Sequence, residues 1–118
     1  DATRTTFAWI PYSEAVVMRS IDSRTLAPIV ETFFYAHPHT KRIHTLAIHA
    51  GGAVEEGTAS TDGATIVIHA QRAADATTTQ TEQRLEQPSA EALRIQTWAI
   101  TGSERTPLAD TTHHSAPL

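Results

Sequence analysis

The sequence predicts an all-β domain: an antiparallel up-and-down meander of about nine strands that closes into a barrel. Apolar and polar residues alternate with a period of two along most of the chain, and turn residues recur every ~8–12 positions. No segment shows helical periodicity over three turns; the stretch 82–93 has some helix formers, but Pro88 interrupts it. With 118 residues, the chain fits a single domain spanning 1–118.

The first four strands are expected at residues 5–10, 14–21, 26–35 and 42–50. Pro11 stops the first strand, and Pro28 stands near the start of the third, where a missing N–H is tolerable. Residues 37–40 are expected to form a turn, because proline fixes φ and lacks a donor.

The other five strands are expected at residues 53–60, 64–71, 77–87, 93–101 and 105–113. Gly57 inside a strand predicts a bulge or a close approach of backbone. Asp62-Gly63 is the strongest hairpin signal in the chain. A meander of this length buries one face, and a barrel of eight or more strands can hold one small ligand inside.

Composition excludes several classes of protein. The formal net charge is −4 and the nine basic residues are scattered, which argues against a nucleic-acid partner. The absence of cysteine excludes disulfides, thiolate metal sites and cysteine nucleophiles. No apolar run approaches the ~18 residues of a membrane span, so we expect a soluble protein, cytoplasmic rather than secreted. The start at Asp1 indicates a removed leader or a piece of a longer chain.

Four histidines, His37, His39, His44 and His49, lie within thirteen residues and raise the question of a metal site. The first two fall in the predicted turn, and strand alternation puts His44 and His49 on opposite faces. Four ligands of one metal ion must converge, so we predict no metal bound here.

Enzymatic signatures are weak. His37-Pro38-His39 matches the first half of the metal signature of cupins, but Arg42 and Ile43 stand where its glutamate should fall. Glu55 and Glu56 point to opposite faces, and strand carboxylates are usually solvated on an outer face. There is no Gly-x-Ser-x-Gly, phosphate loop or His-Glu-x-x-His. We therefore predict no catalytic residue, and an enzyme is the less favoured reading.

The turn Tyr35-Ala36-His37-Pro38-His39-Thr40-Lys41-Arg42 resembles the Tyr-x-Asp-Pro-x-Thr-x-Arg turn of a lipocalin-like (calycin-type) family of uncharacterised bacterial β-barrel domains, with His37 where the family prefers Asp. Gly52, Glu56-Gly57-Thr58 and Asp62-Gly63 match its next segment. The tail, from TEQRLEQPSAEALRIQTWAITG to PLADTTHH, is similar to its last three strands. The resemblance covers residues 7–114, but the family's opening strand with a Gly-x-Trp-x-Gly motif is missing.

This resemblance implies a lipocalin-like barrel that binds a small apolar or amphipathic ligand. The candidate lining residues are large apolar side chains at alternating strand positions: Trp9, Met18, Phe33, Tyr35, Leu46, Ile48 and Trp98. A barrel without its first strand would present unpaired edges, and the uncharged strand TTFAWI predicts a homodimer through such an edge.

Two alternatives stay open. The tail PLADTTHHSAPL is loosely similar to that of the nitrobindins, more distant β-barrel proteins that bind haem through a histidine on the last strand. That similarity implies His113 or His114 as the haem ligand; otherwise no cofactor is predicted. The second alternative is a structural or assembly domain whose interior is filled by side chains.

Overall fold

A computed structural model describes residues 3–11, 13–74 and 76–115, with only the backbone described at 114 and 115. It confirms the predicted fold class: about three quarters of the described residues are in strands, which form a nine-stranded antiparallel meander. The strands are β1 (Thr3–Trp9), β2 (Val16–Asp22), β3 (Pro28–Ala36), β4 (Ile43–His49), β5 (Val54–Asp62), β6 (Thr65–Ala74), β7 (Thr77–Ser89), β8 (Ala92–Thr101) and β9 (Glu104–Ser115). Within the described ranges, no helix is long and apolar enough to cross a membrane.

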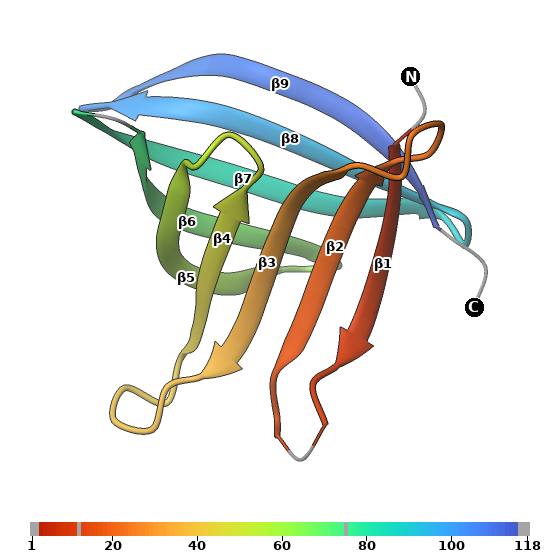
Figure 1. Cartoon of the computed structure of the whole chain (residues 1–118). Coiled ribbons are helices and arrows are strands. Elements are labelled where there is room, and N and C mark those ends of the chain that lie inside the picture. Colours follow the sequence, from red (N-terminus) through yellow and green to blue (C-terminus); the bar gives the residue numbers. More distant parts are fainter. Residues whose placement is uncertain (1–2, 12, 75, 116–118) are drawn as a thin grey trace.

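Each strand pairs with the next one along the chain, and β1 pairs with β9 to close the barrel. In Figure 1, β1–β4 form one wall, β7–β9 the opposite wall, and the curved β5 and β6 join them. Because the number of strands is odd, β1 and β9 run parallel, paired at Arg4–His114 and Thr5–Ser115. The expectation that the first and last strands present unpaired edges is wrong at this seam. Beyond it, residues 6–9 of β1 pair only with β2 within the part of the chain described.

The turns form where proline, glycine and the expected polar residues stand. The turn after β3 is closed by backbone hydrogen bonds from the Lys41 N–H to the His37 carbonyl (3.0 Å) and from the His37 N–H to the Arg42 carbonyl (2.9 Å). Gly63 takes the left-handed φ of 62° that the β5–β6 hairpin needs. Pro88 lies inside β7, where the β7–β8 register shifts, so its missing donor interrupts no regular ladder.

Strand alternation and register define which side chains face the barrel interior. The buried core is formed by Met18, Ile68, Leu85 and Ile95, and half-buried apolar side chains pack against it: Phe34, Ala59, Ala70 and Leu93. Residues two apart on a strand share a face, and directly paired residues of neighbouring strands do too. The interior face of each strand therefore follows from these core residues.

Gly57 confirms the predicted close approach of backbone. It pairs with Ala70 on β6, and a Cβ atom at Gly57 would lie 2.0 Å from the His69 carbonyl oxygen and 2.6 Å from the Ala70 Cα. The β5–β6 register runs without a shift here, so of the two predicted possibilities the close approach is the one found. A glycine is required because β5 and β6 lie too close for any side chain.

Candidate functional site

The seven side chains predicted to line a ligand cavity fall on two faces of the sheet. Met18 lies in the interior core, and Trp9, 72% exposed, stands on the same face at the rim. The other five alternate with interior residues and so lie on the outer face: Phe33, Tyr35, Leu46, Ile48 and Trp98. These five side chains therefore point away from a ligand inside the barrel.

Large apolar side chains gather on the interior face at one end of the barrel. Two adjoining pockets of about 260 and 340 Å³ lie there and share Ile66. We call this region the apolar mouth and define it by six lining residues: Phe7, Phe34, Ile43, Ile66, Leu85 and Leu93. Phe7, Ile43 and Ile66 remain exposed although they face inward. The mouth therefore presents apolar surface to anything that enters it.

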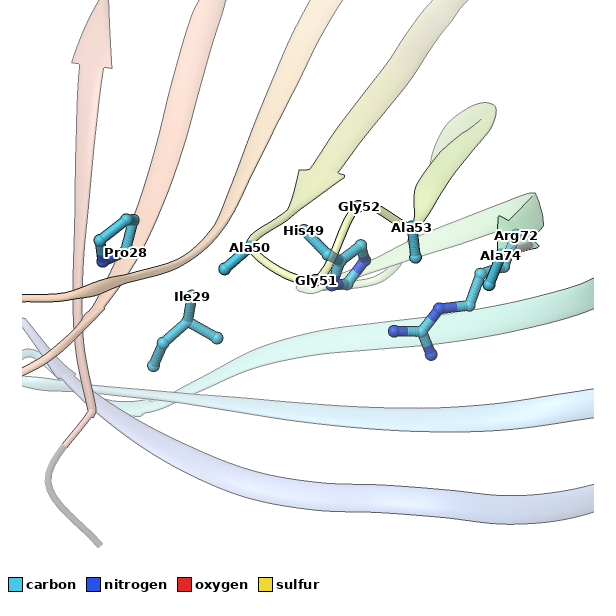
Figure 2. A pocket seen from close by; sticks show the side chains of 9 residues that line it. All are labelled: Pro28, Ile29, His49, Ala50, Gly51, Gly52, Ala53, Arg72 and Ala74. Atoms are coloured by element: carbon cyan, nitrogen blue, oxygen red, sulfur yellow. The ribbon is translucent and has the colours of Figure 1, made fainter.

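A third pocket, of about 510 Å³, lies among the β4–β5 turn, the start of β3 and the end of β6. Figure 2 shows the His49 ring in its middle and the Arg72 side chain reaching inward from β6. The other lining residues carry small or apolar side chains or none: Pro28, Ile29, Ala50, Gly51, Gly52, Ala53 and Ala74. We call it the polar pocket, because an imidazole and a guanidinium group converge there.

Behind the polar pocket lies a buried carboxylate. Glu55, 5% exposed, accepts hydrogen bonds from His49 Nε2 (2.5 Å) and the Thr81 hydroxyl (3.1 Å), and Arg72 Nε lies 3.8 Å away. Desolvation, the largest influence, acts to raise the pKa of Glu55, but the hydrogen bonds and charges of its partners outweigh it and lower this pKa. Glu55 is thus held ionised, and it orients the two groups that face the pocket.

A second buried polar cluster closes the barrel seam. His113 Nδ1 lies 2.6 Å from the Thr5 hydroxyl and 3.5 Å from that of Ser20, while Nε2 lies 2.9 Å from the Thr111 hydroxyl. Burial lowers the pKa of His113 below its usual range. Both ring nitrogens are therefore engaged by hydroxyl groups. The side chain of His114, the other candidate haem ligand, lies outside the described residues.

Three of the four clustered histidines lie close together at the β3–β4 turn, and the fourth lies apart. The His37 ring centroid lies 4.6 Å from that of His44 and 5.7 Å from that of His39, whereas His49 lies apart in the polar pocket. The Thr40 hydroxyl forms a hydrogen bond with His44 Nε2, and His37 Nδ1 accepts a hydrogen bond from the His39 N–H. Among the described residues, no group of three or more metal-ligating side chains has an arrangement that would hold an ion.

Glu82 is a second buried acidic group, on the outer face. It contacts His69 at 3.0 Å, Arg84 at 3.0 Å and Arg105 at 3.2 Å, and Arg105 lies 4.1 Å above the Trp98 ring. Desolvation, the largest influence, acts to raise its pKa, but these partners lower it overall. The expectation that strand carboxylates are solvated is therefore wrong for Glu55 and Glu82, because basic side chains beside them compensate their burial.

Sequence reasoning missed the group formed by His49, Glu55 and Arg72. Its members come from three strands, so no short motif joins them. A signal was present: the Gly51-Gly52 turn places His49 near the start of β5, and Glu55 lies opposite Arg72 in the β5–β6 ladder. Only a fixed register converts that signal into a site.

Fold and interior together define an antiparallel nine-stranded barrel with apolar surface at one end and a charged pocket in the region of the β4–β5 turn. No protein-family model matches the chain, and no curated protein matches it.

Proposed function

We propose that this barrel binds a small apolar or amphipathic molecule, with the apolar part of the ligand in the apolar mouth. The observation that carries the proposal is the exposure of Phe7, Ile43 and Ile66 on the interior face, around two adjoining pockets. Ligand pockets are commonly concave and lined by apolar and aromatic side chains. The combined size of the two pockets of the mouth suits a small organic molecule. The lipocalin-like reading of the sequence points the same way.

The strand β4 offers a matched pair of variants for a test. Ile43 and Ile48 have the same side chain and similar exposure, 43% and 46%, but lie on opposite faces. Ile43→Ala should weaken binding of the uncharged fluorescent probe N-phenyl-1-naphthylamine about fivefold, since the lost apolar contact is worth about 1 kcal/mol.

Ile48→Ala should leave the affinity for that probe unchanged. Equal effects of the two substitutions, or no saturable binding by the unsubstituted protein, would contradict the proposal. In the second case, a structural or assembly domain with a filled interior becomes the better description.

Haem binding is the less favoured function. For His113 to bind haem iron, its Nε2 would have to give up the contact with the Thr111 hydroxyl. Its Nδ1 is already held by the hydroxyls of Thr5 and Ser20. A Soret band on addition of hemin that disappears in His113→Ala or His114→Ala would favour haem instead.

We also infer a homodimer. The inference rests on residues 6–9 of β1, which follow the seam and pair only with β2 among the described residues. An unpaired strand edge is a template for another strand.

A further inference from the structure

We propose that the polar pocket is a second binding site, distinct from the apolar mouth, for a small organic carboxylate whose anionic group pairs with Arg72. The pocket of about 510 Å³ has two polar side chains, His49 and Arg72, among otherwise small or apolar lining residues. A few convergent polar groups in an apolar concavity are the usual arrangement of a small-molecule site.

The charge facing the pocket favours an anion over a cation. Glu55 does not line the pocket, and its two oxygens are occupied by His49 and the Thr81 hydroxyl. Arg72 is the cation that lines it, and its side chain is 36% exposed. The guanidinium of Arg72 therefore presents hydrogen-bond donors and positive charge to the pocket, while Glu55 lies behind it, bonded to His49 and Thr81 and 3.8 Å from Arg72 Nε.

Arg72 has donors to spare. Its Nε lies 3.8 Å from Glu55, too far for a normal hydrogen bond, and the guanidinium group donates no hydrogen bond to any of the described residues. A guanidinium group carries five N–H donors in a planar fork, and a carboxylate can take two of them in parallel. Glu55 still orients the guanidinium by its charge, so the fork is positioned before a ligand arrives.

The walls of the pocket suit the remainder of such a ligand. Pro28 and Ile29 from the start of β3 and the alanines of the β4–β5 turn offer apolar contact. Gly51 and Gly52 leave open space, because a Cβ atom at either position would meet nothing within 4 Å. A compact ring or short chain bearing one carboxylate matches these walls better than a bare inorganic ion.

Benzoate and benzamide provide a matched pair of probes, with the same shape and different charge. In a titration followed by ¹H–¹⁵N NMR, benzoate should shift the amides of Gly51, Gly52 and Ala53 with a Kd of about 1 mM or tighter. Benzamide should bind at least about tenfold more weakly, because it lacks the charge that strengthens a bond to the guanidinium. Inorganic phosphate serves as a third probe, for a free oxyanion.

Arg72→Gln should weaken benzoate binding at least about tenfold, whereas Arg94→Gln, which removes an outer-face arginine of similar exposure (42% against 36%), should not. Gly51→Leu tests the same pocket with all its charges kept. Gly51 has no positive φ, and its added side chain would fill the open space and block benzoate. Ile43→Ala should leave benzoate binding intact, which separates this site from the apolar mouth.

Equal affinity for benzoate and benzamide, or unchanged binding by both Arg72→Gln and Gly51→Leu, would overturn the site. Phosphate binding tighter than benzoate would overturn its assignment to an organic carboxylate. If the unsubstituted protein binds benzoate but not N-phenyl-1-naphthylamine, the proposed function of the apolar mouth is contradicted and the carboxylate site stands.

Discussion

At the scale of single residues, His113 joins the two ends of the chain. Its Nδ1 forms hydrogen bonds with the hydroxyls of Thr5 and Ser20, and its Nε2 forms one with the hydroxyl of Thr111. Hydroxyl groups suit either neutral tautomer, since each both donates and accepts. The charged form is disfavoured by burial, which lowers the pKa of His113.

This burial predicts a pH-dependent stability. The unfolded chain takes up a proton on His113 near the ordinary value of 6.5, whereas the folded state does so only at lower pH. The free energy of unfolding should therefore fall as the pH drops below about 6.5, and this contribution should level off below the folded-state pKa. Urea denaturation between pH 8 and pH 5 would measure it.

His113→Gln should remove this part of the pH dependence and cost about 1–3 kcal/mol of stability, because buried hydroxyls lose a partner. The exposed His39 is the control, since His39→Gln should leave the pH profile unchanged. An identical profile for His113→Gln and the unsubstituted protein would show that the histidine titrates alike in both states.

At the scale of elements, the close contact of β5 with β6 depends on Gly57. A methyl group there would lie 2.0 Å from the His69 carbonyl oxygen and 2.7 Å from the Ala70 Cβ, so the strands would have to separate. Backbone atoms of a ladder cannot move aside as the end of a flexible side chain can.

Gly57→Ala should therefore destabilise the fold by about 3 kcal/mol, the upper part of the usual cost of overpacking. Gly51→Ala is the matched control, because a Cβ there meets nothing and the substitution reduces the freedom of the unfolded chain. Thermal unfolding followed by circular dichroism would compare them. A Gly57→Ala protein as stable as Gly51→Ala would show that the strands separate at no cost.

The strands and turns were predictable from sequence, whereas the faces were not. Period-two alternation and the Asp62-Gly63 signal depend on local chemistry, so they locate a strand and a hairpin without knowledge of the fold. Face assignment failed on β3 and β4 because both faces of these strands carry apolar residues. Phe34 faces inward and Phe33 outward, and nothing local distinguishes the two.

The pairing of β1 with β9 and the charged groups in the interior could not be located without the register of strands distant in sequence. Glu55 and Arg72 face each other only because β5 and β6 pair as they do. The His113–Thr5 contact spans 108 positions of sequence, a separation at which no turn signal acts. The apolar mouth was partly predictable: alternation along the strand TTFAWI puts Phe7 and Trp9 on one face, but the opposing Ile66 and Leu93 required the whole barrel.

At the scale of the whole molecule, the remaining edge of β1 predicts self-association. Size-exclusion chromatography with light scattering should give twice the 12.8 kDa chain mass. Ala8→Lys places a charge on this edge and should shift the protein towards monomer. Gln71→Lys, on the outer face of the central strand β6, should not. A measured mass equal to that of one chain at every concentration would contradict the homodimer.

The meander with its short parallel seam also sets an order of assembly. Eight of the nine strand pairings join neighbours in the chain and need only short loops to close, whereas the β1–β9 pairing must bring together segments about a whole chain apart. Loop closure costs more entropy as the loop lengthens, and distant contacts slow folding. The seam should form last, once a curved open sheet already exists. Among the described residues, two pairs join β1 to β9, whereas nine join β6 to β7. The same seam should therefore be among the first places to open in the folded protein, and its amides should exchange hydrogen faster than those of β6 and β7.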